Sequence, residues 1–419
     1  MLLLVVPHLN CNLFCHYCYE GRYRKKHKTE TKAYNLEIML KRMEELKNGY
    51  STMCLHGGEP LMLPKQDVRA ILLKIKELTG KSGIQTNGTL IDDDFIKIFK
   101  ECSTSVGLSC DGPGELSEYR FYKYKNIDLD KKIEKMIKEK INIGLMIVIS
   151  KANAGTPQRL KKLKDWILKL DKKGISGRLN PCGYSPGYEL EEKELIKVYL
   201  DLAKFCFFHN LKWSPFTDII NGLQGKSRVC TFSGCDPFCT PSATELLGDG
   251  SLTNCMRVNQ DYILLRHPIK YNTRNEILSQ TSQEFGGCQD CQYWHACYGG
   301  CPTMTINGDW RNRTYLCPTW KALFKFYEKA LTYCGISLVK KSTEQKSSYQ
   351  CENLKCQDSE HGDSHGDSEH GDWTDNDSEY QGSEHEDSYG DSEHGDSHGD
   401  SEHGDSHGDS EHGDWTDNS

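Results

Sequence analysis

The end of the chain lacks almost every residue type from which an apolar core is built. From Gln357 to Ser419 there is no Ala, Val, Ile, Leu, Met, Phe, Pro or Cys, and no Lys or Arg. A segment of this composition cannot bury enough apolar surface to offset the entropy lost when it is ordered. The sequence therefore argues against a further globular domain here and predicts a disordered tail.

Long apolar runs are also missing. No stretch approaches the ~20 consecutive apolar residues of a membrane span, and the apolar start Met1–Val6 lacks the length and basic flank of a secretory signal. We therefore expect a cytoplasmic protein that does not contact a membrane. In that reducing compartment the 20 cysteines are better explained as metal-ligating thiolates than as disulfides.

The two signs of charge are distributed unevenly. The segment from Gln357 onward holds 14 Asp and 8 Glu, so the rest of the chain has 52 basic and 38 acidic residues and a net charge of +14. A basic body could attract its own acidic tail or another acidic partner. Charge alone does not choose between these, and we expect no nucleic-acid partner.

Six apolar runs alternate with amphipathic segments up to about residue 212. The expected strands are Leu2–Pro7, Thr52–His56, Gly83–Thr86, Ser105–Ser109, Ile143–Ser150 and Ile175–Leu179. The expected helices are Tyr34–Leu46, Gln66–Leu78, Asp92–Cys102, Asp128–Lys138, Pro157–Leu170 and Glu189–His209. Regular alternation predicts an α/β fold with parallel strands and helices packed outside. The pattern suits a partial barrel as well as an open, doubly wound sheet.

Residues 225–335 have a different character. They contain ten cysteines, many Gly and Pro, and little periodicity. We expect such a segment to be held by metal clusters rather than by a large apolar core. The predicted organisation is thus a core in 1–215, a cysteine-rich domain in 225–335, a polar linker in 336–357 and a His/Asp/Ser/Gly repeat tail in 358–419.

Cys11, Cys15 and Cys18 form a C-x3-C-x2-C motif directly after the first expected strand. Barrel enzymes place their chemistry in loops at this end of the strands. Three thiolates can bind three irons of a cubane and leave the fourth iron open to another ligand. Three cysteines with this spacing could also bind zinc, which usually takes four ligands in a structural site.

This motif, with Tyr17 before its last cysteine, resembles the signature of the radical S-adenosylmethionine (SAM) superfamily. The resemblance implies a partial (β/α)6 barrel and a [4Fe–4S] cluster whose open iron binds SAM. It further implies that reductive cleavage of SAM yields a 5′-deoxyadenosyl radical that abstracts hydrogen. An electron donor such as flavodoxin or ferredoxin would supply the reducing electron.

Three further motifs stand where that superfamily has them. Gly57-Gly58-Glu59-Pro60 closes the second expected strand, Thr86-Asn87-Gly88 the third, and Ser109-Cys110-Asp111-Gly112-Pro113 the fourth. The resemblance implies SAM binding by Gly57, Gly58, Glu59, Asn87 and Ser109. Asp111 is a candidate catalytic base. If a substrate radical adds to an aromatic ring, the ring regains its aromaticity only by losing a proton, and a base must accept that proton.

The later cysteines resemble the SPASM extension of radical SAM peptide and protein maturases. Cys288, Cys291, Cys297 and Cys301 give C-x2-C-x5-C-x3-C before Cys317, and Cys239 and Cys255 enclose Gly250. The resemblance implies a first auxiliary [4Fe–4S] cluster on Cys239, Cys255, Cys301 and Cys235, with Cys230 as an alternative fourth ligand. It implies a second on Cys288, Cys291, Cys297 and Cys317, and so three clusters in all. A zinc ribbon is the alternative for these pairs.

The tail repeats one spacing. Thirteen of its residues are His, Trp or Tyr, and twelve of these have Asp two positions later. Most units that depart from His-Gly-Asp keep that spacing, as in Trp373-Thr374-Asp375 and Tyr389-Gly390-Asp391, and only Tyr380 lacks the Asp. This resembles the substrates of cyclophane-forming radical SAM/SPASM maturases, which join an aromatic ring to the β-carbon two residues on. The predicted function is therefore a peptide maturase that forms ring-to-Asp carbon–carbon crosslinks in its own tail or in a related peptide.

Other functions are compatible with parts of the sequence. Sulfatase maturases oxidise a residue of a separate protein, but they carry Asp directly after the cysteine aligned with Cys255, where this chain has Met256. A His- and Asp-rich tail could also bind Zn, Ni or Cu loosely, or simply keep the protein in solution. A protein whose function is metal binding by the tail would leave the three cysteine sets unexplained.

Overall fold

A curved, largely parallel sheet forms the centre of the structure. The computed structural model describes residues 2–21, 34–122, 125–126, 129–226, 230–237, 240–255 and 273–339. All of these residues belong to one compact unit, and a second unit begins at residue 354. The second unit, which includes the predicted repeat tail, lies outside the described residues, as does most of the predicted linker.

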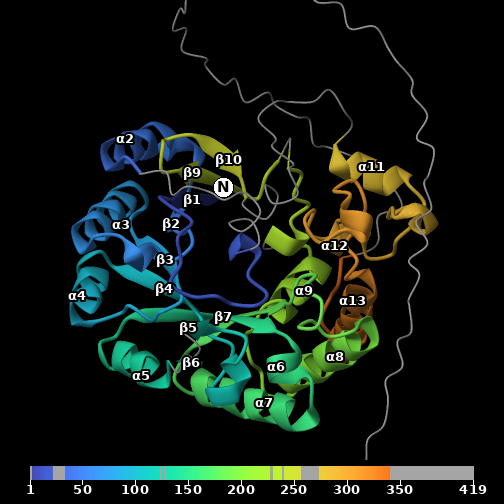
Figure 1. The fold of residues 1–419 in the computed structure, drawn as a ribbon. Coiled ribbons are helices and arrows are strands. Elements are labelled where there is room, and N and C mark those ends of the chain that lie inside the picture. Colours follow the sequence, from blue (N-terminus) through green and yellow to red (C-terminus); the bar gives the residue numbers. More distant parts are fainter. Residues whose placement is uncertain are drawn as a thin grey trace, which may run out of the picture. The chain divides into compact units, whose positions relative to one another are not determined.

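The six predicted strands are all present. The strands are β1 (Leu2–Val6), β2 (Thr52–Leu55), β3 (Ser82–Thr86), β4 (Thr104–Ser109), β5 (Phe121–Tyr122), β6 (Lys125–Asn126), β7 (Asn142–Ile149), β8 (Ser176–Pro181), β9 (Ala243–Leu247) and β10 (Leu252–Asn254). The main sheet has the order β10-β9-β1-β2-β3-β4-β7-β8. All its pairs are parallel except the antiparallel pair of β9 and β10. The predicted radical SAM-type barrel is confirmed, with the sheet curving around a central space (Figure 1).

Helices cover the outer face of this sheet (Figure 1). The helices of the described residues are α2 (Leu36–Leu46), α3 (Lys65–Thr79), α4 (Asp93–Glu101), α5 (Asp130–Lys138), α6 (Lys151–Ala154), α7 (Pro157–Asp171), α8 (Glu192–Phe208), α9 (Phe216–Leu223), α11 (Arg274–Gln280), α12 (Trp294–Cys297) and α13 (Cys317–Tyr333), of which the last three belong to the cysteine-rich region. The longer helices pack by an apolar stripe; α3, for example, buries Val68, Ile71, Leu72 and Ile75. Helix starts follow their capping residues, as where the Asp92 carboxylate accepts from Phe95 N over 3.0 Å.

The cysteine-rich region is joined to the barrel by the sheet. Strand β9 pairs in parallel with β1, with Leu246 opposite Val5. The main sheet therefore contains strands from both sides of the predicted boundary at residues 215–225, and the predicted domain division stays a prediction.

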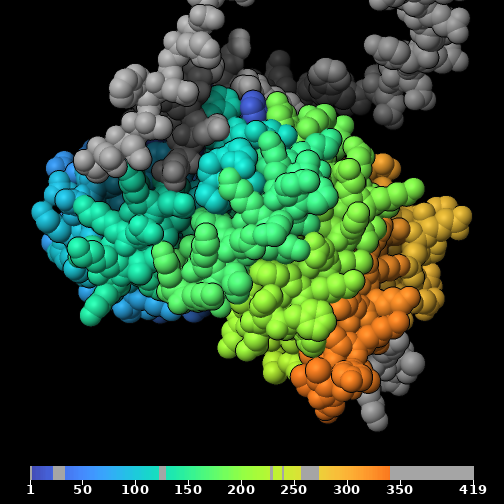
Figure 2. Space-filling model, turned by 90° about the horizontal axis from the view of Figure 1, so that it is seen from below, coloured from blue at the N-terminus to red at the C-terminus, as the bar shows by residue number. Residues whose placement is uncertain are grey.

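The expectation that residues 225–335 have little apolar core is wrong for α13. This helix buries Trp320, Leu323, Phe324, Tyr327 and Leu331 and packs against α8 and α9. The spacing of these side chains is that of one helical face. Figure 2 shows α13, in orange, beside the green segment that contains α8. Apolar packing therefore holds the end of this region, and the irregular part is limited to the residues before α13. Among the described residues, none of the helices is long and apolar enough to cross a membrane.

Candidate active site

The loop after β1 carries three cysteines along the wall of a large cavity. The cavity has a volume of about 1380 Å3, and Cys11, Cys15 and Cys18 all line it. Two backbone amides lie close to sulfur: Leu13 N is 3.4 Å from Cys11 Sγ, and Gly21 N is 3.3 Å from Cys18 Sγ. The structure therefore brings the three predicted thiols to one place at the carboxyl end of β1.

Two glycines allow the loop after β2 to pack against the start of this cysteine loop. Gly57 has a φ of +133°, which side chains disfavour. A Cβ on Gly58 would lie 2.2 Å from the Asn10 carbonyl oxygen. Gly58 N donates to the His8 carbonyl over 3.2 Å. Both glycines line the cavity, and any larger residue at 58 would force the two loops apart.

Glu59 is wholly buried and joins two of the predicted motifs. Its carboxylate accepts from Thr86 Oγ1 at 2.6 Å, Asn87 N at 2.7 Å and Leu61 N at 3.0 Å. Burial raises the pKa of Glu59, and the hydrogen bonds from Thr86, Asn87 and Leu61 lower it. Glu59 is not among the residues that line the cavity. Its carboxylate fixes the end of β3 to the loop after β2, and its predicted contact with SAM stays a prediction.

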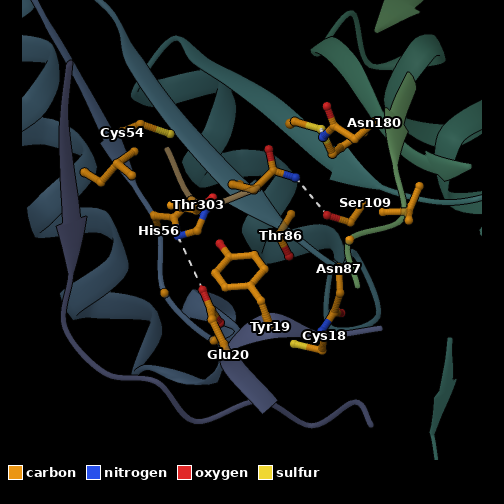
Figure 3. A pocket seen from close by; sticks show the side chains of 18 of the residues that line it. Cys18, Tyr19, Glu20, Cys54, His56, Thr86, Asn87, Ser109, Asn180 and Thr303 are labelled. Atoms are coloured by element: carbon orange, nitrogen blue, oxygen red, sulfur yellow. Dashed lines mark hydrogen bonds and ion pairs between the residues drawn. The ribbon is translucent and has the colours of Figure 1, made fainter. Parts of the chain in front are cut away.

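Asn87 and Ser109 do line the cavity (Figure 3). Asn87 Nδ2 is 2.9 Å from Asn12 Oδ1 and 3.7 Å from Cys11 Sγ. Ser109 Oγ accepts from Gln85 Nε2 over 2.8 Å. The carboxyl ends of β3 and β4 thus place polar side chains in the same space as the thiols.

Asp111 lies behind the cavity wall. It is almost fully buried and accepts from Val148 N at 2.9 Å and from the Tyr17 hydroxyl. Arg120 Nη1 donates to that hydroxyl over 2.9 Å, and burial raises the pKa of Asp111 while the charge of Arg120 lowers it. Tyr17 and Arg120 line the cavity, and Asp111 does not. Asp111 therefore reaches the cavity only through Tyr17.

A histidine–glutamate pair outside the predicted site residues faces the same cavity (Figure 3). His56 Nδ1 lies 3.9 Å from Glu20 Oε1, and the Glu20 side chain is 7% exposed. His56 directly precedes Gly57, and Glu20 follows Cys18 by two residues. Both residues could have been predicted from the sequence, because they lie beside the cysteine motif and the Gly57-Gly58 motif.

The cysteine-rich region supplies part of the cavity wall. Residues 303–308 line the cavity together with the barrel strands. Cys301, two residues before this wall, has its Sγ 3.2 Å from Thr303 Oγ1. One of the predicted auxiliary-cluster ligands is therefore tied to a residue of the cavity wall.

Four of the later cysteines surround a second, small cavity. Its lining includes all the predicted ligands of the second auxiliary cluster: Cys288, Cys291, Cys297 and Cys317. Burial raises the pKa of Cys288 to about 12, and the charges of Cys291 and Cys317 act in the same direction. Burial raises the pKa of Cys297 well above its usual value, and the charges of the other three cysteines raise it further. The structure thus gathers this predicted set completely.

The predicted ligands of the first auxiliary cluster are gathered in part. Cys235 Sγ lies 3.4 Å from Ser242 N. Burial is the main cause of the raised pKa of Cys235, and the neighbouring charge of Cys301 raises it further. Cys230, the alternative ligand, is exposed. Cys255 follows β10 and is partly buried, and Cys239 lies outside the described residues. The geometry favours Cys235 over Cys230 as a partner of Cys301.

Comparison with known proteins agrees with this geometry. Residues 5–163, which contain the cysteine loop and all three companion motifs, match the family model of the radical SAM superfamily. The chain carries a radical SAM domain. The protein is thus an enzyme that modifies a substrate, and the predicted resemblance is confirmed.

The similarity to known proteins extends beyond the radical SAM domain. A cysteine-type anaerobic sulfatase-maturating enzyme of Clostridium perfringens is 24% identical over 75% of this chain and 93% of its own length. The solved structure of native anSMEcpe with bound AdoMet and Kp18Cys peptide has a TM-score of 0.62 and 21% identity, covering 80% of this chain and 98% of its own. Streptococcus suis SuiB bound to precursor peptide SuiA has a TM-score of 0.52 and 14% identity, covering 75% of each chain. These structures share the fold of this enzyme.

The residues present suit the cofactors of a radical SAM domain, which are SAM and a [4Fe–4S] cluster. Burial raises the pKa of Cys15 to about 12. The charge of Arg120 lowers that pKa, while the charges of Cys18 and Cys11 raise it. Three thiolates at this place therefore need compensating positive charge, which iron supplies. In the described part of the chain, no three His, Cys, Asp or Glu side chains are placed so that they could hold a single metal ion together. In a cubane, by contrast, each thiolate binds its own iron. Cys11, Cys15 and Cys18 would hold the cluster, with the cavity beside them for SAM.

Proposed function

We propose that this radical SAM enzyme is a maturase that modifies side chains of a peptide or protein substrate. The observation that carries the proposal is the shared cavity, whose wall combines the cysteine loop with residues 303–308. Its volume of about 1380 Å3 exceeds that of ordinary small-molecule pockets, at about 300–1,000 Å3. A substrate side chain therefore has room beside the cofactor. The sulfatase-maturating relatives and SuiB with its precursor peptide support the same class of substrate.

The finer proposal is that the enzyme forms ring-to-Asp links in its own tail or in a related peptide. It rests on the ring-x-Asp spacing that twelve of thirteen tail rings keep. SAM and its cluster, when bound, supply a 5′-deoxyadenosyl radical that takes one hydrogen atom from the Asp β-carbon. The new bond joins that carbon to the ring, and the ring then loses a proton to a base and an electron to an acceptor. Two hydrogens leave the peptide for each link.

Tethering would make the tail an accessible substrate. A flexible linker of about 22 residues, as predicted for 336–357, has a root-mean-square span of about 25 Å. Such a tether provides a local substrate concentration on the order of millimolar. The same cavity could then serve successive ring-x-Asp units without release of the chain.

His56 is the proposed acceptor of the proton. Its ring lines the cavity, and the buried Glu20 carboxylate 3.9 Å from Nδ1 can orient it and stabilise its protonated form. Asp111, the candidate from sequence, has both carboxylate oxygens engaged behind the wall. In this proposal Asp111 is a positioning residue that holds Tyr17 in the cysteine loop.

The auxiliary cysteines are the proposed route for the electron. Cys235, Cys239, Cys255 and Cys301 would hold one cluster, and Cys288, Cys291, Cys297 and Cys317 the other. Cys301 is tied to the cavity wall through Thr303, so the first of these sites is suited to accept the electron that leaves the substrate. A flavodoxin or ferredoxin would supply the electron that starts the next cycle.

Mass spectrometry of the anaerobically expressed protein tests this function. The enzyme incubated with SAM and a strong reductant should lose about 2 Da per link while 5′-deoxyadenosine accumulates. Fragmentation should become silent within units such as Trp415-Thr416-Asp417. Trp415→Ala should abolish that link, and a Cys11→Ala protein should show neither change. An unchanged tail mass during 5′-deoxyadenosine formation would remove the tail as substrate.

The second candidate is oxidation of a residue in a separate protein. It is favoured by the sulfatase-maturating enzyme that this chain matches over 93% of its length, and by the higher TM-score to anSMEcpe than to SuiB. Met256, which lies outside the described residues, departs from the sulfatase-maturase pattern. Incubation with cysteine- and serine-containing sulfatase peptides should yield an aldehyde if this function is correct, and intact peptide if it is not.

A further inference from the structure

Arg274, the first residue of α11, is wholly buried. Arginine is almost never buried to this degree unless its charge is compensated. Its backbone amide donates to Asp236 Oδ2 over 2.5 Å, and Asp236 directly follows Cys235. One end of Arg274 is therefore fixed beside a predicted ligand of the first auxiliary cluster.

The guanidinium reaches the other side of the same site. It donates to the carbonyl oxygens of Trp310 at 2.7 Å and of Gly300 and Asn312 at 3.0 Å each. Gly300 directly precedes Cys301. Within the described residues, every hydrogen bond from this guanidinium ends on a backbone carbonyl. Carbonyls satisfy the donors but carry no net charge, so the negative charges that face this cation are the Asp236 carboxylate, bound by the Arg274 backbone amide, and the thiolates of the site.

We propose that Arg274 is the counter-charge of the auxiliary site that contains Cys235 and Cys301, and that it raises the reduction potential of the cluster bound there. This inference rests on the auxiliary clusters of the proposed function. Thiolate ligands make the site anionic, and reduction adds a further negative charge. A buried cation stabilises the reduced form more than the oxidised form, because the low dielectric leaves their attraction unscreened.

The electrostatics of the surrounding groups agree with that geometry. Burial lowers the pKa of Arg274, while the charges of Cys301, Cys235, Cys288 and Asp236 act to raise it. The charge of Arg274 also acts on Cys288 of the second auxiliary site, but less than on Cys301 and Cys235. That second site has further cations in Lys321 and Arg313, which are only partly buried. Arg274 would therefore act most on the site nearer the cavity wall and make that site the better electron acceptor.

The test measures reduction potentials in the full chain with Cys11, Cys15 and Cys18 all changed to Ala, which leaves only auxiliary clusters. Potentials are followed by electron paramagnetic resonance together with iron content, for Arg274→Gln, Arg274→Lys and a control. The control, Arg311→Gln, removes a cation of the same region that is exposed and paired with Asp309. We expect Arg274→Gln to shift the reduction equilibrium of one cluster at least tenfold toward the oxidised form, a fall of about 59 mV for one electron. Arg274→Lys and Arg311→Gln should stay close to the parent.

Loss of one cluster in Arg274→Gln with retention in Arg274→Lys would also support the proposal, because the charge would then be what the site requires. Full iron with unchanged potentials in Arg274→Gln would overturn it. So would equal loss of that cluster in both variants, which would assign Arg274 to the fold alone. A parent without iron would overturn the auxiliary clusters themselves, and this outcome is distinct from the others because it appears before Arg274 is changed.

Discussion

The barrel and the cysteine-rich region hold their thiols in place by different means. The loop with Cys11, Cys15 and Cys18 leaves the end of β1, a strand paired on both sides, and is packed against Gly57 and Gly58. Cys235, Cys288, Cys291 and Cys301 lie on irregular backbone, and Arg274 donates to the carbonyl oxygen of Gly300 beside Cys301. A regular sheet can position ligands before metal arrives, whereas irregular backbone depends on the metal for much of its order. The difference suggests experiments that treat the two regions separately.

Removing all iron should have the largest effect and should separate the regions most clearly. Chelation or oxidation of the clusters should abolish formation of 5′-deoxyadenosine. Limited proteolysis should then cut residues 230–316 first, because their order depends on clusters, while the barrel and α13 resist longer. Mass spectrometry of the fragments locates the cuts. Equal resistance of both regions would contradict the comparison.

Changing Cys11, Cys15 and Cys18 together to Ala should abolish SAM cleavage and leave the auxiliary region intact. Iron should fall by about one third from about 12 per chain, as expected for the loss of one of three cubanes. Iron analysis and 5′-deoxyadenosine assays measure both effects. Iron near 4 per chain in the unchanged enzyme would exclude the two auxiliary clusters.

His56→Gln should separate radical formation from product formation within the barrel. A general base contributes about 10²–10⁴-fold, so product should fall by that factor while 5′-deoxyadenosine continues to form. The matched control is His209→Gln, since His209 is exposed at the end of α8. Equal losses of product and 5′-deoxyadenosine in His56→Gln would assign His56 to SAM binding instead.

Gly58→Ala should disturb the cysteine loop without removing any ligand. The new Cβ would lie 2.2 Å from the Asn10 carbonyl oxygen, so the backbone must shift, and displacements of about 1 Å at an active site can cost about 10²-fold in rate. Gly183→Ala is the control, because Gly183 lines the same cavity and a Cβ added there would have no neighbouring atom within 4 Å. SAM-cleavage rates of the two variants give the comparison, and equal rates would show that the loop contact is not needed.

Leu323→Ala should have the smallest effect on activity. Leu323 is wholly buried on α13, and Leu→Ala in a core costs about 2–5 kcal/mol of unfolding free energy. Although Cys317 at the start of α13 is a predicted cluster ligand, apolar packing of the helix beyond it is the main support of Leu323, so that loss should be similar with and without clusters. Denaturant unfolding measures it, with exposed Lys325→Ala as control. A loss confined to the iron-loaded protein would show that α13 also depends on metal.

Local pattern was enough to predict the strands of the barrel, whereas the choice of a barrel over an open sheet came from the family resemblance. Each predicted strand corresponds to a strand of the sheet, with differences of one or two residues at the ends, as for Ile175–Leu179 against Ser176–Pro181. Buried strands are short apolar runs between helical segments, so their positions follow from local sequence. The thiols of the first site are close in sequence and were found in the same way. The face of α13 was also readable from its spacing, although we expected metal to hold that region.

Pairing across long separations was not predictable. Leu246 opposes Val5 although about 240 residues lie between them, and no local pattern states which strands become neighbours. Arg274 stands in no motif, and its importance follows only from burial and from the carbonyls around it. His56 and Glu20 are adjacent to motifs, but their meeting depends on how the loops after β1 and β2 fold.

The place of β9 beside β1 has a consequence for the order of events during synthesis. Strand β1 is paired with β2 and β9, and β9 is made about 190 residues after β2 ends. At about 5–20 residues per second, that interval is roughly 10–40 seconds. During this time the strand that carries the cysteine loop has one unpaired edge, and the sheet that positions the loop is incomplete. We therefore expect cluster delivery to the first site to follow, rather than accompany, translation of the barrel.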